Sequence, residues 1–147
     1  MTKINIKVVV ENLVDTFLNA GKISLDLRDK GLTKETKSDN TPVSNGDLEV
    51  NKIISQKISK LTPDIPIISE ETSDNKSIKS LKNFWLIDPI DGTYDYINNK
   101  DEFTINAGLI IDNRPVAGLI YAPAKNRMFY SYGMNYAFEL INGKPVK

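Results

Sequence analysis

Four segments rich in β-branched and aromatic residues follow one another in the second half of the chain, and they constrain the fold more than any other feature. The segments are FTINAGLII, PVAGLIYAP, NRMFYSY and YAFELI, and only DNR separates the first two. Such closely spaced strands are typical of a mostly antiparallel sheet. Two earlier apolar runs, IPIIS and FWLID, predict further strands.

Two amphipathic patterns come before most of these strands. Apolar residues recur at helical spacing over residues 6–18, and this pattern stops near Gly21. A second helical pattern opens at Asp47 and ends after Leu61. The polar segment 30–46 between them predicts an exposed and mobile loop. The sequence therefore predicts an α+β fold, with two helices packed on one face of a mostly antiparallel sheet.

The length and the end of the chain suggest one domain of a larger protein. The 147 residues, 40% of them hydrophobic, can bury one core, so we expect a single domain over residues 1–147. The last residues, FELINGKPVK, predict a strand, a turn at Asn142–Gly143, and a returning strand without room to form. Because half a hairpin leaves an open sheet edge, we expect further chain to follow.

The composition removes several classes of function. The chain has no cysteine and no histidine, which excludes thiolate nucleophiles, Cys/His zinc sites and Ser-His-Asp triads. Nineteen basic and nineteen acidic residues balance, so nothing favours a nucleic-acid partner. The first residues include acids where a signal peptide would have an unbroken apolar core, and no apolar run approaches the roughly 18 residues of a membrane span. We therefore expect a cytoplasmic protein, either free or peripheral at the inner membrane.

The stretch FWLIDPIDGTYDY, residues 84–96, carries the clearest chemical signal. Asp88 follows an apolar strand, and we expect Pro89 to turn the chain there. In a tight turn Asp91 would face the same point as Asp88, and two like charges repel unless a cation lies between them. Carboxylates and the carbonyl of Ile90 are oxygen ligands of the kind that Mg²⁺ prefers.

The residues after Asp91 predict an anion site beside this cation. Gly92 permits close backbone approach, and the amides of Gly92 and Thr93 would begin a helix through YDYIN. Adjacent cation and anion sites suit a phosphate ester held over a metal. The hydroxyl of Thr93 would then be free to orient a water molecule.

Two other acidic groups also follow or precede regular elements. Glu70 and Glu71 end the run PIISEE, and Asp39 and Asp47 lie around a turn at a predicted helix start. Singly, a solvated strand edge explains Glu70, a helix N-cap explains Asp47, and turn chemistry explains DGT. Three such acidic ends in one small domain favour a shared site.

Three segments together resemble a known family. SDNTPVSNGD, PIISEE and WLIDPIDGTYDYINNKDEFTINAGLI, with PVAGLIYAP after them, are similar in order and spacing to the inositol monophosphatase superfamily. The DNTPV, EFT-N and YAP segments most resemble the bacterial 3′(2′),5′-bisphosphate nucleotidases of the CysQ type. The resemblance implies the N-terminal half of a layered sugar-phosphatase fold. It also implies magnesium-dependent hydrolysis of adenosine 3′,5′-bisphosphate to AMP and phosphate in sulfur metabolism, with inositol 1-phosphate as the alternative substrate.

The resemblance also implies metal ligands. Glu70, Asp88 and the carbonyl of Ile90 would bind one Mg²⁺ ion, and Asp88 and Asp91 would share a second. By the same resemblance we expect two or three such ions in all, and inhibition by Li⁺.

Further roles follow from the same resemblance. Asp47 and Thr93 would polarise the attacking water, and Lys37 and Asp39 would lie in a mobile loop that closes the site. The residues implied in contact with the substrate phosphate are Glu70, Ile90, Asp91, Gly92 and Thr93.

Two departures from the family pattern are visible. Ser44, Asn45 and Gly46 stand where the family usually has threonine and alanines, and we expect them to make this segment less rigid. The family's second domain, with a further aspartate ligand in a WD segment and most of the nucleoside pocket, has no counterpart here. The resemblance therefore implies an N-terminal half that lacks its C-terminal partner domain and has little activity alone.

Two other interpretations remain open. A haloacid-dehalogenase-type phosphatase also has a DxDGT motif after an apolar strand, but here two residues separate the acids and one of them is a proline. A trapped aspartyl-phosphate would support that class. The chain could also be a non-catalytic remnant or scaffold that pairs through its sheet edge. Absence of Mg²⁺ binding and of hydrolysis in a completed protein would support this last class.

Overall fold

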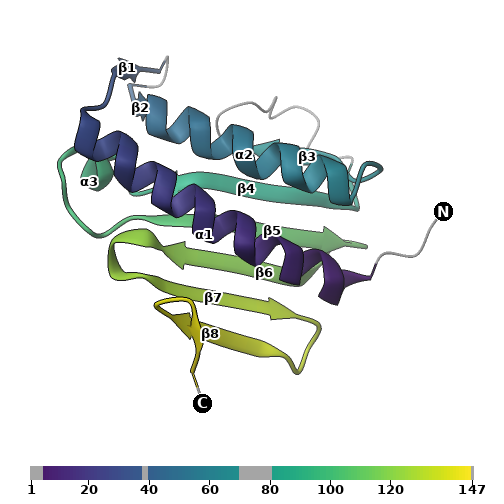
Figure 1. The fold of residues 1–147 in the computed structure, drawn as a ribbon. Helices are drawn as coiled ribbons and strands as arrows, with labels where there is room; N and C mark the ends of the chain where they lie inside the picture. The colour runs from purple at the N-terminus through teal and green to yellow at the C-terminus, as the bar shows by residue number, and fades with distance from the viewer. Residues whose placement is uncertain (1–4, 38–39, 70–80, 147) are drawn as a thin grey trace.

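The computed structural model describes residues 5–37, 40–69 and 81–146. Its main elements are α1 (Ile6–Lys30), α2 (Asn45–Leu61), β3 (Ile67–Ser69), β4 (Phe84–Asp91), α3 (Thr93–Ile97), β5 (Thr104–Ile111), β6 (Arg114–Ala122), β7 (Arg127–Tyr132), β8 (Ala137–Ile141) and β9 (Lys144–Pro145). The strands β3 to β9 form one sheet in sequence order. The helices α1 and α2 lie side by side across one face of this sheet (Figure 1).

The strand directions agree with the prediction. β3 and β4 run parallel, and the other neighbouring pairs of the sheet, from β4–β5 to β8–β9, run antiparallel. The predicted α+β fold, with two helices on one face of a mostly antiparallel sheet, is confirmed.

Helix α1 is longer than predicted, because it passes through Gly21 and ends at Lys30. At Gly21 the helix lies directly against β6, where an added Cβ atom would be 2.2 Å from a ring carbon of Tyr121. Gly21 therefore makes room for an aromatic ring and does not end the helix. The helix ends instead at Gly31, whose φ of 96° is unfavourable for residues with a side chain.

The segment between the two helices contains a short hairpin, where the sequence predicted a mobile loop. β1 (Lys34–Thr36) pairs antiparallel with β2 (Pro42–Ser44). Helix α2 begins at Asn45, two residues before its predicted start, because Ser44 caps it. The Ser44 side chain accepts a hydrogen bond from the backbone N–H of Asp47, whose carboxylate accepts from the backbone N–H of Ser44.

Strand β4 continues to Asp91, so the predicted turn at Pro89 is wrong. The pairing with β5 shifts register between Asp88 and Asp91. A bulge tolerates proline, because the disrupted ladder does not need the missing N–H. The chain turns at Gly92, whose φ is 91°, and α3 follows at once, as predicted for YDYIN.

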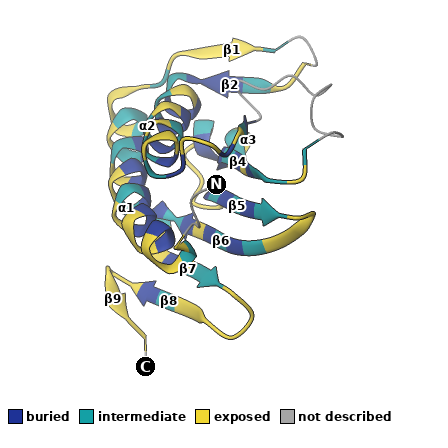
Figure 2. Cartoon of the chain, turned by 90° about the vertical axis from the view of Figure 1, so that its right-hand side faces the viewer, coloured by how far each residue is buried: buried dark blue, intermediate teal, exposed yellow. Residues whose placement is uncertain are grey.

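The hydrophobic core lies between the two helices and the sheet, as the buried residues in Figure 2 show. The largest buried side chain there, Trp85, donates from its indole nitrogen to the Thr62 hydroxyl at 3.1 Å. No described helix covers the other face of the sheet (Figure 2). Leu86, Ile120 and Phe129 lie on that open face and are 50, 48 and 38% exposed.

The last described residues form a tight hairpin. Asn142 and Gly143 both have positive φ, at 53° and 76°, as a two-residue turn of this type requires. The predicted turn is confirmed, but the return strand does form over two residues, Lys144–Pro145, and pairs with β8. Among the described residues, no helix is both long and apolar enough to span a membrane.

Candidate active site

Asp47 is fully buried in the first turn of α2, and both oxygens of its carboxylate accept hydrogen bonds. Oδ2 accepts from the backbone N–H of Ser44 at 2.9 Å and from the Ser44 hydroxyl at 2.5 Å. Oδ1 accepts from the hydroxyl of Thr93 at 2.8 Å. Asp47 is therefore not the N-cap of the helix; it closes the capping box and also contacts Thr93.

Thr93 begins α3, and its hydroxyl lies between α2 and the end of β4. In addition to Asp47, this hydroxyl has the carbonyl oxygen of Ile90 within 3.1 Å. A hydroxyl donates one proton and can accept with its lone pairs. Because the Thr93 hydroxyl donates its proton to Asp47, its oxygen can still accept a hydrogen bond from a water molecule. The structure thus brings the predicted pair together across 46 residues of sequence; its catalytic role stays a prediction.

Asp88 and Asp91 lie on either side of the register shift in β4. Asp88 is half-buried and pairs with Asn106 of β5, while Asp91 is exposed and pairs with Thr104. Asn106 and Thr104 are themselves linked, because the Asn106 amide donates to the Thr104 hydroxyl at 3.0 Å. The donors at this end of β4, two carboxylates and the carbonyl of Ile90, are all oxygen and fit a hard divalent cation.

The third predicted carboxylate ligand cannot be placed in the same way. Glu70 and its neighbour Glu71 lie outside the described residues. The last described residue before them, Ser69, pairs with Ile87, which immediately precedes Asp88. Among the described residues alone, no group of three or more potential side-chain metal ligands occurs.

The predicted mobile loop is described only in part. Lys37 follows β1 and is half-buried, and its backbone N–H donates to the carbonyl of Thr41 at 2.8 Å. This bond lies at the end of the β1–β2 hairpin. Asp39 lies outside the described residues.

Gly92 is required by both its backbone conformation and its surroundings. Its φ of 91° is unfavourable for other residues, and an added Cβ would lie 2.7 Å from the carbonyl oxygen of Glu102 and 3.4 Å from Cα of Phe103. A glycine here lets the loop pack closely against the start of β5. Its predicted contact with a substrate phosphate stays a prediction.

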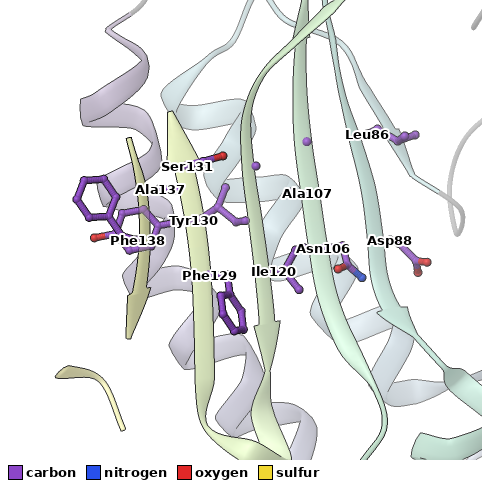
Figure 3. Close-up of a pocket in the computed structure, with 13 residues that line it drawn as sticks. Leu86, Asp88, Asn106, Ala107, Ile120, Phe129, Tyr130, Ser131, Ala137 and Phe138 are labelled. Atoms are coloured by element: carbon purple, nitrogen blue, oxygen red, sulfur yellow. The ribbon is translucent and has the colours of Figure 1, made fainter. Parts of the chain in front are cut away.

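Asp88 also lies at one end of a groove of about 450 Å³ on the open face of the sheet (Figure 3). Gly108 and Gly118 face each other in neighbouring strands and form part of its floor. Apolar side chains, among them Leu86 and Phe129, line much of the remainder. The groove therefore joins the acidic end of β4 to an apolar surface.

The sequence pattern of the inositol monophosphatase family matches residues 5–146, almost the whole chain. This chain belongs to the inositol monophosphatase family. The predicted family is thereby confirmed. Among curated members, the 3′(2′),5′-bisphosphate nucleotidase CysQ of Aggregatibacter actinomycetemcomitans is 32% identical over 141 residues, which cover 95% of this chain and 52% of that protein. The chain thus spans about half the length of the curated relatives it matches.

Solved structures of inositol monophosphatase family members share the fold. CysQ from Bacteroides thetaiotaomicron superposes with a TM-score of 0.65 and 25% identity, over 87% of this chain and 47% of that one. A staphylococcal inositol monophosphatase-1 gives a TM-score of 0.83 at 19% identity, over 99% of this chain and 55% of that one. In both comparisons the match again covers about half of the known protein.

Each of the three residues in the first departure from the family pattern, Ser44, Asn45 and Gly46, makes a specific contact. Ser44 completes the capping box. Asn45 accepts a hydrogen bond from the backbone N–H of Thr33 at 3.1 Å. Gly46 leaves room for Tyr96, because an added Cβ would lie 2.2 Å from the Tyr96 hydroxyl oxygen. These contacts join the segment to Thr33 and to α3, and the expected lower rigidity of the segment stays a prediction.

Sequence reasoning missed Tyr96, which is fully buried behind the candidate site. Burial, followed by the nearby charge of Asp47, raises the pKa of Tyr96, although Arg28 acts in the opposite direction. The hydroxyl is therefore neutral and donates a hydrogen bond. Apart from its place in YDYIN, the sequence carries no signal for this role, because the residues it contacts are remote in sequence.

Proposed function

We propose that this chain forms the metal- and phosphate-binding half of a magnesium-dependent phosphatase that hydrolyses adenosine 3′,5′-bisphosphate to AMP and phosphate. The observation that carries the proposal is the hydrogen-bonded pair of Asp47 and Thr93, 2.8 Å apart, beside the acidic end of β4. Membership of the inositol monophosphatase family supports phosphate ester hydrolysis. The relatives named as CysQ nucleotidases support the substrate.

The oxygen donors Asp88, Asp91 and the carbonyl of Ile90 would hold Mg²⁺, with Glu70 as a further ligand. A family structure described as complexed with Mg²⁺ and phosphate supports this choice of ion. When bound, Mg²⁺ makes a water molecule easier to deprotonate and offsets negative charge on the phosphoryl oxygens. A chain without histidine has no imidazole base, so this assistance matters here.

The protein's own part is to position the attacking water. The water donates a hydrogen bond to Oγ1 of Thr93, whose own proton is directed to Oδ1 of Asp47. Ser44 holds the other carboxylate oxygen, so Asp47 cannot rotate freely. The proton lost from the water would pass through Thr93 to Asp47 as the new phosphorus–oxygen bond forms. The bond between phosphorus and the ribose 3′ oxygen breaks in the same in-line displacement, and the leaving 3′ oxygen takes a proton from solvent to give AMP.

The remaining residues would hold the phosphate and close the site. The backbone amides of Gly92 and Thr93 would contact the phosphoryl oxygens, together with Asp91 and Glu70 through the metal. Lys37 and Asp39, between β1 and β2, would lie over the bound ester. We also propose that the second half found in the relatives supplies the nucleoside pocket.

The test is to join this chain to the C-terminal half of the A. actinomycetemcomitans relative, which we call the joined protein. We expect it to hydrolyse adenosine 3′,5′-bisphosphate with Mg²⁺ in preference to inositol 1-phosphate. Replacement of Asp88 by asparagine should lower turnover by about 10³-fold or more, because one charge that offsets the transition state is lost.

The matched control is Asp112→Asn, which makes the same chemical change in an exposed hairpin turn. Asp112 has a φ of 51°, a conformation that asparagine also tolerates. This variant should keep full turnover. Preference for inositol 1-phosphate would reassign the substrate, and a folded Asp88→Asn variant with normal turnover would overturn the metal assignment.

A further inference from the structure

Tyr96 links α3 to α1 across the back of the candidate site. Its side chain is fully buried, and its hydroxyl donates to the carbonyl oxygen of Ser24 at 2.6 Å, although 72 residues separate the two in sequence. Tyr96 lies one helical turn after Thr93 in α3. The position of α3 relative to the long helix α1 therefore depends on this side chain.

The same side chain also contacts the start of α2. A Cβ atom on Gly46 would lie 2.2 Å from the Tyr96 hydroxyl oxygen and 2.7 Å from a ring carbon, so the ring lies against the bare backbone at this position. Gly46 immediately precedes Asp47. The Tyr96 ring thus contacts Gly46, the residue before Asp47. Tyr96 itself belongs to α3, the short helix that begins with Thr93.

Arg28 and Phe103 support Tyr96 from the other side. The Tyr96 and Phe103 rings lie 4.8 Å apart, and the Arg28 guanidinium lies 5.7 Å from the first ring and 5.1 Å from the second. Arg28 also donates to the carbonyl oxygen of Lys100 at 2.7 Å. Phe103 in turn lies against Gly92. The two ends of the segment from Gly92 to Phe103 are therefore in contact with each other.

We propose that Tyr96 is a positioning residue, which holds Thr93 in register with Asp47. The helix α3 has only five residues, and a helix of this length is not stable by itself, so tertiary contacts must fix its place. The hydrogen bond between Thr93 and Asp47 joins α3 to α2, and a shift of about 1 Å in an active site can cost 10²-fold in rate. The expected effect on turnover rests on the proposed function; the effect on local structure does not.

The first measurement is hydrogen–deuterium exchange of the 147-residue chain at micromolar concentration. Tyr96→Leu should speed amide exchange about tenfold in two separate segments, 45–48 and 92–97, relative to the parent chain. Tyr121→Leu is the matched control, because Tyr121 is another buried tyrosine packed against a helix glycine, Gly21. It should speed exchange near Gly21 and leave both segments unchanged.

The second measurement is steady-state turnover of the joined protein. Tyr96→Leu should lower kcat about tenfold or more with KM little changed, and Tyr96→Phe, which keeps the ring, should recover most of this loss. In a Thr93→Ala background, Tyr96→Leu should cause little further loss, because both changes disrupt the same hydrogen bond. Tyr121→Leu should leave kcat unchanged in the folded protein.

Each outcome decides between the proposals. Unchanged exchange in either segment would overturn the positioning role, whatever the activity. Faster exchange with a normal kcat in an active joined protein would also overturn it. A third outcome is that Tyr96→Leu speeds exchange but the joined protein hydrolyses no phosphate ester even without the substitution. The structural link would then stand, and the result would count against the proposed function instead.

Discussion

At the scale of single residues, Asp47 makes two sets of contacts at once. One carboxylate oxygen caps α2 through Ser44, and the other accepts from Thr93. The capping role of Asp47 and its proposed catalytic role are therefore compatible. The cap fixes the carboxylate, and a fixed carboxylate is what an ordered proton acceptor requires.

Thr93 should matter for rate more than for metal binding. Thr93→Ala in the joined protein removes the hydroxyl that we propose orients water, and we expect kcat to fall about 10²-fold. Thr93→Ser keeps the hydroxyl and should recover most of the activity. Calorimetry with Mg²⁺ should give similar affinities for all three proteins. Equal losses of metal affinity and rate would show that the hydroxyl acts on the ion.

The sequence predicts the candidate site residues that lie close together along the chain. It does not predict the buried residue that supports them, Tyr96. Asp88 and Asp91 lie in the last part of β4 and Thr93 comes just after it, so their proximity is a local property. Tyr96 depends on contacts with Ser24 and Gly46, which only the folded chain brings close. No periodicity or spacing rule carries such information.

At the scale of elements, tertiary contacts overrode two residues that usually interrupt regular structure. Gly21 lies in the middle of α1 because the ring of Tyr121 occupies the space of its side chain. Pro89 lies within β4 because the register shift removes the need for its N–H. The sequence rules predicted an end at each position, since they consider one element at a time.

Gly21→Ala tests this account of α1. Alanine is intrinsically better in a helix by about 1 kcal/mol, but overpacking a filled site costs about 1–3 kcal/mol. We expect the clash with Tyr121 to prevail and urea denaturation to show a net loss of stability. Asn19→Ala, at an exposed position of the same helix, should instead be neutral or slightly stabilising. A stabilised Gly21→Ala protein would mean that Tyr121 moves aside easily.

At the scale of the whole molecule, the two faces of the sheet differ. Helices cover one face, while no described helix covers the other, which carries an apolar groove that ends at Asp88 (Figure 3). The relatives are about twice as long as this chain. We therefore expect Mg²⁺ binding to be weaker, and association through the open face stronger, in the chain alone than in the joined protein.

Lithium inhibition tests the metal chemistry of the joined protein. A staphylococcal family structure is described as an inhibitory complex after soaking in 100 mM LiCl. We expect millimolar Li⁺ to lower turnover of adenosine 3′,5′-bisphosphate, with Na⁺ at equal concentration as the control for ionic strength. Insensitivity to Li⁺ would weaken the assignment of a magnesium site of this family's type.

The open face also predicts how the 147-residue chain behaves alone. Ile120 and Phe129 are partners on neighbouring strands of that face, and each exposes more than a third of its surface. Exposed apolar patches favour association. We expect light scattering and size-exclusion chromatography to show concentration-dependent oligomers, and calorimetry and assays to show weak Mg²⁺ binding with little hydrolysis. In the joined protein, association should cease and hydrolysis should appear.

A pair of surface variants decides whether the open face causes this association. Replacing Ile120 and Phe129 together by threonine keeps strand propensity while removing apolar surface, so the chain should become monomeric without a large loss in Tm. Leu48→Gln is the control, because Leu48 is 48% exposed on α2, away from that face. It should leave the oligomers unchanged. If the control disperses them and the double variant does not, the chain associates through its helices and the open face is not the contact.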